Sequence, residues 1–369
     1  MNFSIEPGLH RRTPVTHWLQ DAQGRTLAFS AYPALNPWAE VFISHGYGEH
    51  RGWWHHVATA LVMRGVNVYS FDHFHHGVSD GPNWDLESYD DMVAGFLLAL
   101  RQGVAPLRHA DLPLVLLAHS NGALISLLAQ QHLHPGELSA MVLDNPMLGL
   151  PPLTRLGGNL LAALVLALKG NDGPTQPVLK SLSPRQLTSL RTIWADYGKD
   201  RFRPHYITPR YYAAMKVACR QAMTQTKSAV PVLLLTGGRD GVVNHANIRA
   251  WYAQLEAPAK HLVHYPALRH EVFNEVGWRS VLEDVLGWMA YMFAAERVPL
   301  AMAIGQVASG VRPRREAATK DRLQAAPPAP ATPATAQPKS IAEKPVKKPA
   351  VKKPAPKKPT AKKTAKPKP

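Results

Sequence analysis

The segment "VLLAHSNGAL", Val115–Leu124, is the most informative part of this chain for its fold class. It begins as an apolar run of strand length and continues as a helical pattern, with Ser120 at the junction. A serine at such a junction can cap the helix, because its oxygen accepts a hydrogen bond from a first-turn N–H. It can also lie on a tight strand-to-helix turn that exposes its hydroxyl for nucleophilic attack. The rest of the sequence has to decide between these two interpretations.

Strand-like and helix-like segments alternate around this stretch over residues 12–300. The apolar runs of strand length are 15–20, 26–32, 39–46, 66–73, 112–120, 139–147, 230–238 and 260–266. The helical patterns are 53–65, 86–104, 122–134, 245–257 and 278–296. Such alternation predicts an α/β fold with a mostly parallel sheet flanked by helices on both faces. The first two runs, joined by a short turn, predict an antiparallel pair.

One long segment, residues 150–229, interrupts this alternation because it contains no clear strand. We expect it to be a helical cap inserted into a core formed by 12–149 and 230–300, over the carboxyl edge of the sheet where ligands bind. Within it, the apolar stretch 159–168 is shorter than the roughly 20 residues that span a bilayer. That stretch predicts a buried helix, or alternatively a helix that leans on lipid or on an apolar substrate.

The net charge of +16 is concentrated at the C-terminal end. Residues 339–369 contain twelve lysines and one acid, Glu343. The Ala-, Pro- and Lys-rich composition of 312–369 predicts a disordered basic tail. Lysine runs bind polyanions, so an anionic membrane surface or nucleic acid is a candidate partner, and a purely solubilising tail is the alternative. No aromatic residues are interleaved for base stacking, so nucleic acid would be bound through its backbone.

Cysteine content and the N-terminal sequence indicate the compartment. Cys219 is the single cysteine, which excludes an internal disulfide and fits a reducing environment. The N-terminal residues show no apolar stretch typical of a secretory signal. We therefore predict a cytoplasmic protein, which its tail could also place at the inner face of the membrane. No obligate protein partner is inferred.

Candidate catalytic residues follow predicted strands in the order Ser120, Asp240, His270. This is the chain order of the nucleophile, acid and base in α/β-hydrolases. A serine hydroxyl is a poor nucleophile near neutral pH, so an imidazole must accept its proton and a carboxylate must orient that imidazole. Asp144 also ends a predicted strand and is the alternative acid.

An oxyanion hole requires fixed N–H donors. The N–H after the proposed nucleophile belongs to Asn121, and an early loop after residues 39–46 offers a second donor, the N–H of Tyr47. Glycines flank Tyr47 because the backbone must turn sharply there and approach the substrate.

Histidine runs at 53–56 and 72–76 raise the alternative of a metal site. The chain has neither a cysteine pair nor a helical H-x-x-x-H pair with a nearby acid. We therefore predict no metal and no cofactor.

At these residues the sequence resembles the monoacylglycerol lipase and bacterial lysophospholipase family of cap-bearing α/β-hydrolases, also described as serine aminopeptidase S33-like or "hydrolase 4" domains. The resemblance covers about residues 12–295. It is carried by "HGYGEH" (45–50), "FDHFHHGVSDGP" (71–82), "AHSNGA" (118–123) and "RHEVFNE" (269–275). Departures from the family pattern are His75 for glycine, Ala118 and Ala123 for glycine, and Asn121 for methionine.

This resemblance implies a serine hydrolase that cleaves carboxylic esters of lipids, either lysophospholipids or monoacylglycerols, through an acyl-enzyme. It implies Ser120 as nucleophile, His270 as base and Asp240 as orienting acid, and Asn121 is expected to alter the pocket wall. A peptidase stays open, because ester and amide acyl transfer use the same triad. A second alternative is a hydrolase-fold binding protein that docks on anionic membrane or nucleic acid through its tail.

Overall fold

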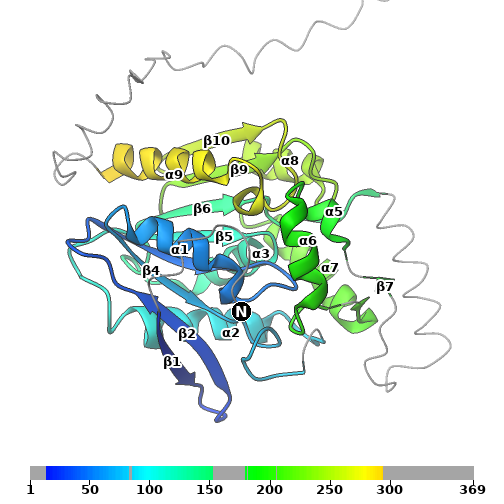
Figure 1. Cartoon of the computed structure of the whole chain (residues 1–369), viewed down its shortest axis with the longest axis horizontal. Coiled ribbons are helices and arrows are strands. Elements are labelled where there is room, and N and C mark those ends of the chain that lie inside the picture. The colour runs from blue at the N-terminus through cyan, green and yellow to red at the C-terminus, as the bar shows by residue number, and fades with distance from the viewer. Residues whose placement is uncertain (1–13, 83–84, 153–178, 181, 205, 294–369) are drawn as a thin grey trace, which may run out of the picture. The chain divides into compact units, whose positions relative to one another are not determined.

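The computed structural model describes residues 14–82, 85–152, 179–180, 182–204 and 206–293 (Figure 1). The predicted tail, 312–369, and the apolar stretch 159–168 lie outside these residues. Within them, no helix is long and apolar enough to cross a membrane.

An eight-stranded sheet forms the centre of the fold, in the order β1-β2-β4-β3-β5-β6-β9-β10. Its strands are β1 (Val15–Gln20), β2 (Thr26–Tyr32), β3 (Ala39–Ser44), β4 (Val66–Phe71), β5 (Leu114–His119), β6 (Ala140–Asp144), β9 (Val232–Gly237) and β10 (Lys260–Tyr265). β2 pairs antiparallel with β1 and β4, and every other pair is parallel. All residues of β3, β4, β5, β6 and β9 are buried, as expected for parallel strands covered on both faces.

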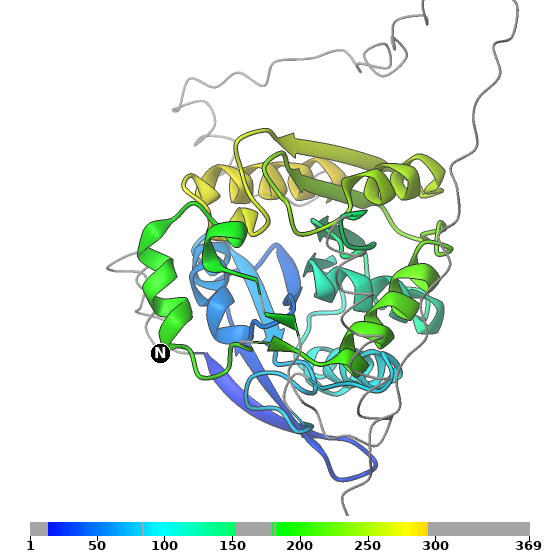
Figure 2. The same cartoon turned by 90° about the vertical axis from the view of Figure 1, so that its right-hand side faces the viewer.

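Helices cover both faces of this sheet. They are α1 (His55–Val62), α2 (Asp90–Leu98), α3 (Asn121–Ala129), α8 (His245–Gln254) and α9 (Trp278–Phe293). α1 and α9 lie on one side of the sheet, and α2, α3 and α8 lie on the other (Figure 2). The predicted α/β fold with a mostly parallel sheet is therefore confirmed.

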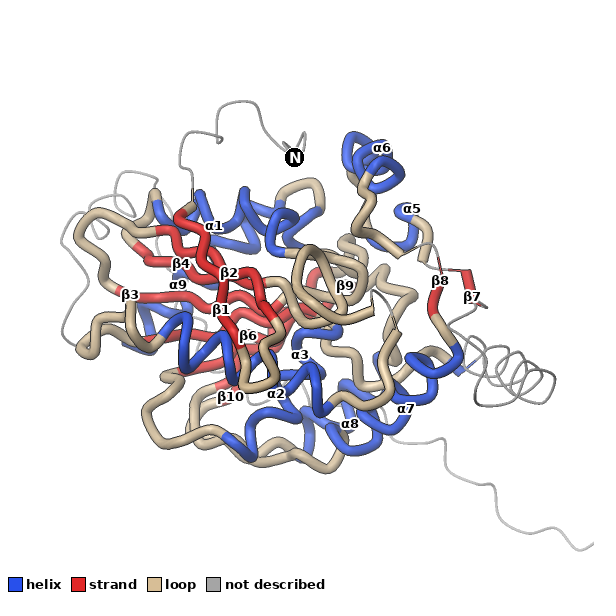
Figure 3. Tube along the Cα trace, turned by 90° about the horizontal axis from the view of Figure 1, so that it is seen from below, coloured by secondary structure: helices blue, strands red, loops and turns tan. Residues whose placement is uncertain are grey.

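The insertion between β6 and β9 contributes α5 (Pro184–Leu187), α6 (Arg191–Lys199) and α7 (Pro209–Ala222). These helices lie beside the carboxyl ends of the parallel strands (Figures 1 and 3). α7 packs on α3, and every residue of α3 is buried. α3 is covered both by the sheet and by α7. This explains why its sequence, "NGALISLLA", is mainly apolar around the helix rather than along one stripe.

The structure differs from the sequence predictions at two places. The helix predicted from residue 86 begins at Asp90, and it passes into a π-helical segment over Ala99–Val104. The insertion, predicted to contain no strand, forms a two-residue antiparallel pair of β7 (Leu179–Lys180) and β8 (Tyr206–Ile207). Two-residue strands are too short to leave a periodic signal in the sequence.

The strand order creates a binding position at one end of the sheet. β3 lies between β4 and β5, so the chain leaves β3 toward one side and later returns on the other. Ligands of open α/β sheets bind at such a switch point, beyond the carboxyl ends of the strands. The loop after β3 and the turn after β5 meet there.

Candidate active site

Ser120 lies on a strained turn between β5 and α3. Its backbone angles are φ 51° and ψ −111°, in a region that non-glycine residues rarely adopt. Its side chain makes no hydrogen bond to the first turn of α3. The helix-capping interpretation of this serine is therefore wrong. Backbone bonds hold the turn, from Ser120 N–H to the Asp144 carbonyl at 2.8 Å and from Met147 N–H to the Ser120 carbonyl at 3.1 Å.

Gly122 allows this turn to lie against β3. A Cβ at this position would lie 2.2 Å from the Ser44 carbonyl oxygen and 2.5 Å from that of His45. Both neighbours are backbone atoms and have no rotamer to change. Glycine is therefore required here for close approach. Ala118 and Ala123, which stand where the family that the sequence resembles has glycines, are both fully buried.

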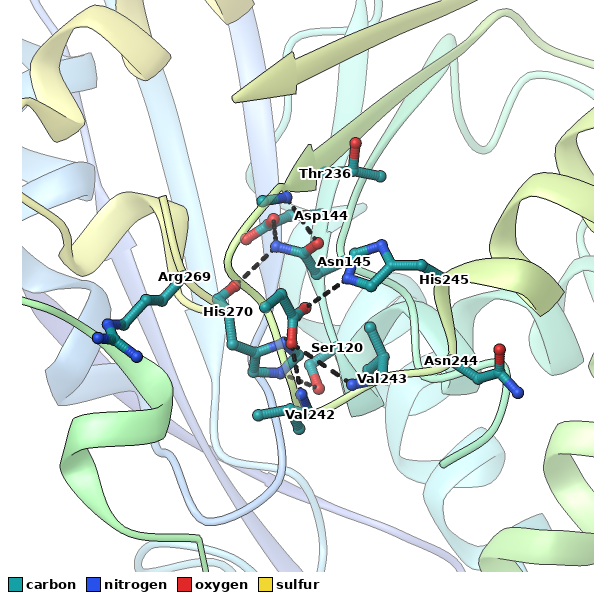
Figure 4. Close-up of polar contacts among 12 residues, drawn as sticks. Ser120, Asp144, Asn145, Thr236, Val242, Val243, Asn244, His245, Arg269 and His270 are labelled. Atoms are coloured by element: carbon teal, nitrogen blue, oxygen red, sulfur yellow. Dashed lines mark hydrogen bonds and ion pairs between the residues drawn. The ribbon is translucent and has the colours of Figure 1, made fainter. Parts of the chain in front are cut away.

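A line of hydrogen bonds joins Ser120, His270 and Asp240. Ser120 Oγ lies 2.8 Å from His270 Nε2, and His270 Nδ1 lies 2.8 Å from Asp240 Oδ2. The side chains of Ser120 and His270 point toward each other from separate loops (Figure 4). All three residues are buried. The structure thus brings together three residues that the sequence separates by up to 150 positions.

The carboxylate of Asp240 is held in its ionised form. Burial raises its pKa, but the His270 imidazole and the N–H of Val242, 2.6 Å from Oδ1, lower the pKa to below its usual value. His245 Nε2 lies 3.7 Å from the same carboxylate. An ionised acid at this position orients the imidazole with its Nδ1–H toward the carboxylate, which leaves Nε2 able to accept a proton.

Asp144, the alternative acid, faces a different histidine. Its Oδ2 lies 2.7 Å from His119 Nδ1, and its Oδ1 accepts a hydrogen bond from the Asn145 amide at 3.1 Å. Asn145 also donates to the His270 carbonyl at 2.8 Å, so it fixes the backbone of the loop that carries the imidazole. Asp144 therefore does not contact the His270 ring in the way that Asp240 does.

The loop after β3 forms a tight turn around Tyr47. Glu49 Oε2 accepts the Gly46 N–H at 2.8 Å and the Trp54 indole N–H at 3.0 Å. Gly48 has φ +73°, and a Cβ there would lie 2.9 Å from Pro204. The predicted need for glycines on both sides of Tyr47 thus has a specific cause, since a Cβ at Gly46 would also lie 2.8 Å from the His119 ring.

A cavity of about 160 Å³ opens beside Ser120. The lining includes apolar side chains, which are those of Met147, Leu150, Leu182, Leu187, Ile207, Met215 and Val242. It also includes polar or ionisable side chains, which are those of Glu49, His119, Arg203 and Glu271 together with Ser120, Asn121 and His270. Tyr47 and Tyr212 complete the wall. The mixed lining therefore offers contacts both to an apolar chain and to a polar group of one bound molecule.

The sequence did not single out the buried ionisable residues of this wall. Burial opposes a charge on His119, but the carboxylates of Asp144 and Glu49 outweigh it and raise the His119 pKa to about 9. Burial, with the Glu49 charge, raises the pKa of Glu271 well above its usual value, and Glu271 accepts a hydrogen bond from Tyr197 of α6. Glu49, His119 and Glu271 lie inside the motifs "HGYGEH", "AHSNGA" and "RHEVFNE", so those motifs could have pointed to these three residues.

Arg203, the remaining ionisable residue of this group, lies outside all of the quoted motifs, so the sequence did not mark it as a cavity residue. Its guanidinium lies 4.0 Å from the centre of the Tyr197 ring, and burial lowers its pKa to about 10.

The histidine runs pack inside the protein. His73 and His76 are fully buried, and burial lowers the pKa of each, to about 3 for His76, so both are neutral. Ser44 Oγ lies 3.1 Å from His73 Nε2, and the His73 N–H donates to His45 Nε2 at 3.1 Å. Among the residues that the structure describes, no three His, Cys, Asp or Glu side chains are grouped to hold a metal ion.

Known proteins resemble this chain over most of its length. Residues 36–277 match the profile of the family described as "Serine aminopeptidase, S33". The monoacylglycerol lipase of Mycolicibacterium smegmatis is 32% identical over 259 residues, which cover 70% of this chain and 90% of that protein. The human monoglyceride lipase is 27% identical over 297 residues, covering 76% of this chain and 94% of that protein.

The fold also matches solved structures. A soluble variant of the monoglyceride lipase from Saccharomyces cerevisiae, in complex with a substrate analog, superimposes with a TM-score of 0.68 at 20% identity. The match covers 78% of this chain and 98% of that one.

Proposed function

The chain belongs to the serine aminopeptidase S33 family and is a serine ester hydrolase, and we propose that it cleaves carboxylic esters of lipids through an acyl-enzyme formed on Ser120. One observation carries this proposal. The hydrogen bonds from Ser120 Oγ through His270 to Asp240 are 2.8 Å at each step, within the range expected of a nucleophile, its base and the orienting acid.

In the first step His270 Nε2 accepts the Ser120 proton as Oγ attacks the ester carbonyl carbon. The imidazole becomes positively charged, and the ionised Asp240 stabilises that charge through its bond to Nδ1. The imidazolium then donates its proton to the leaving alcohol. The acyl group remains on Ser120 until a water, deprotonated by the same imidazole, releases the fatty acid.

The oxyanion of each tetrahedral intermediate needs preorganised donors. We assign them to the backbone N–H groups of Asn121 and Tyr47. Asn121 is the first residue of α3, where N–H groups lack intrahelical acceptors and the helix dipole favours negative charge. Tyr47 lies in the glycine-flanked turn that the Glu49 carboxylate closes.

We infer the substrate class from the mixed lining of the cavity. The apolar residues of the lining, among them Leu150, Ile207 and Met215, suit an acyl chain, and the polar residues of the lining suit a small hydrophilic alcohol. We therefore propose single-chain lipid esters, monoacylglycerols or lysophospholipids, as substrates. The monoglyceride lipases among the relatives support the first of these two classes.

The test uses the full chain and its Ser120→Ala variant. Labelling by a fluorophosphonate probe reports an activated serine, and fatty acid release is measured from monooleoylglycerol and from lysophosphatidylcholine. We expect labelling and release by the wild type and neither by Ser120→Ala. A folded wild type that is not labelled would refute the Ser120 mechanism. Labelling with hydrolysis of aminoacyl p-nitroanilides but not of lipid esters would show the peptidase alternative to be correct.

Docking on anionic membrane or nucleic acid through residues 312–369 stays a prediction from the sequence. Those residues lie outside the part of the chain that the structure describes. No feature of the described residues favours this second function over ester hydrolysis.

A further inference from the structure

The side chains of Tyr89, Asn121 and Tyr211 form hydrogen bonds with one another next to the proposed nucleophile. The Tyr89 hydroxyl donates to Asn121 Oδ1 at 2.6 Å, and Asn121 Nδ2 donates to the Tyr211 hydroxyl at 3.1 Å. The two phenol oxygens lie 3.5 Å apart. The exposed fractions are 4% for Tyr89, 1% for Asn121 and 0% for Tyr211. We call these three residues the polar clasp.

The members of the clasp come from three separate parts of the fold. Tyr89 immediately precedes α2, Asn121 follows Ser120 as the first residue of α3, and Tyr211 lies in the first turn of α7 in the insertion. The clasp therefore joins the insertion to the turn that carries the nucleophile. α3 and α7 also pack on each other.

Tyr211 also contacts the oxyanion loop. Its ring centre lies 4.8 Å from that of Tyr47, with the planes inclined at 61°. Edge-to-face packing of this kind fixes the orientation of both rings. Tyr211 thus contacts both proposed oxyanion donors. Its hydroxyl accepts a hydrogen bond from the Asn121 side chain, and its ring packs against the ring of Tyr47.

Hydrogen bonds give this contact a defined geometry. Apolar packing between α3 and α7 would tolerate sliding, whereas a buried amide that loses its partners pays the cost of desolvation. Burial raises the pKa values of Tyr89 and Tyr211, so both stay neutral phenols that can donate and accept. The methionine usual at the position of Asn121 in the resembling family has no donor and only a weak acceptor. Its replacement by Asn121 is what makes the clasp possible.

Residues of α7 that follow Tyr211 line the cavity, so the position of α7 affects the shape of the cavity. Tyr212 and Met215 line the cavity beside Ser120. We propose that Tyr89, Asn121 and Tyr211 are positioning residues that fix α7 against the nucleophile turn and hold Tyr47, and so set both the oxyanion geometry and the width of the acyl site. This inference rests on the proposed function, in which Ser120 attacks a lipid ester.

The test begins with Tyr89→Phe and Tyr211→Phe, each of which removes one hydroxyl without adding volume. The matched control is Tyr291→Phe on α9, where the side chain is 76% exposed. kcat and KM are measured for p-nitrophenyl esters of increasing acyl length, and hydrogen exchange is measured over residues 209–222. We expect about a tenfold loss of kcat, a weaker dependence on acyl length, and faster exchange in α7.

A double-mutant cycle isolates the pairwise contact. Asn121→Leu keeps the backbone N–H but removes the amide, and we expect its effect on kcat and that of Tyr211→Phe to be strongly non-additive. The proposal is overturned if Tyr211→Phe matches Tyr291→Phe in its kinetics, or if α7 exchanges at the wild-type rate in Tyr211→Phe. Hydrogen exchange needs no activity, so it tests the clasp even if the wild type cleaves none of the esters and the proposed function fails.

Discussion

Replacing each of two buried aspartates by asparagine tests the central geometry of the site. The Asp240 carboxylate bonds to the His270 ring with one oxygen and to the Val242 N–H, at 2.6 Å, with the other. Asparagine has one carbonyl oxygen, and the fixed backbone N–H of Val242 retains it. Its NH₂ group then faces His270 Nδ1, which must become an acceptor, and the ring proton moves to Nε2. In that tautomer the imidazole cannot accept the Ser120 proton.

We therefore expect Asp240→Asn to lose about 10⁴-fold in kcat, as other serine hydrolases do when the tautomer is inverted, which is about 5 kcal/mol in the barrier. Asp144→Asn is the matched control, because Asp144 bonds to His119 and not to His270. It should lose less than about tenfold in kcat and about 2 kcal/mol in unfolding free energy, the value of a charge-assisted hydrogen bond.

The assay measures kcat on monooleoylglycerol, the rate of fluorophosphonate labelling, and the Tm of each variant. Tm separates a chemical defect from unfolding. If folded Asp144→Asn loses more activity than Asp240→Asn, the assignment of the orienting acid is wrong.

Three further predictions concern stability. Gly122→Ala should cost more than about 3 kcal/mol of unfolding free energy, because its Cβ meets two backbone oxygens. Gly287→Ala, in open space on α9, should be neutral or stabilising by up to about 1 kcal/mol; equal urea midpoints for the two variants would contradict the packing described at the turn. The pKa of His119 is raised from 6.5 to about 9, so its contribution is fully present below pH 6.5 and is lost as pH rises through 9. That contribution amounts to about 3 kcal/mol, and His119→Gln should flatten the fall in unfolding free energy over this window, whereas parallel curves for variant and wild type would argue against a buried cation. Because the pKa of Glu271 is raised in the folded chain, Glu271 ionises at a lower pH in the unfolded chain, which destabilises the fold as pH rises. Glu271→Gln should therefore increase Tm more at pH 8 than at pH 5. A smaller gain at pH 8 would indicate that Glu271 is charged in the folded chain.

Much of the fold could be predicted from local patterns. The apolar runs at 39–46, 112–120 and 230–238 correspond to β3, β5 and β9, because a strand covered on both faces must be apolar throughout. The positions of Ser120 and Asp240 directly after such runs place both at the carboxyl edge of the sheet. The sheet order itself was not encoded in any single run.

The sequence favoured Asp240 over Asp144 as the orienting acid, but the contacts of each acid come from the tertiary structure. Asp144 ends β6 and Asp240 follows β9, so either acid satisfies the chain order of nucleophile, acid and base. Strand order places β6 between β5 and β9, with His119 opposite Asp144 in the register of β5 and β6. That register gives Asp144 its own histidine and leaves Asp240 for His270.

The sequence was enough to predict the strands of the central sheet, the loops that follow them, and the α/β-hydrolase order of Ser120, Asp240 and His270. Two sets of contacts became visible only in the folded chain. Arg203 and Glu271 line the cavity, and Asn121 forms hydrogen bonds with Tyr89 and Tyr211. The physical reason is that these contacts join residues far apart in the chain. Hydrophobic periodicity reports burial along a few residues of backbone. A contact between α3 and α7 depends instead on how an insertion folds back over the sheet, which no periodicity in either helix specifies.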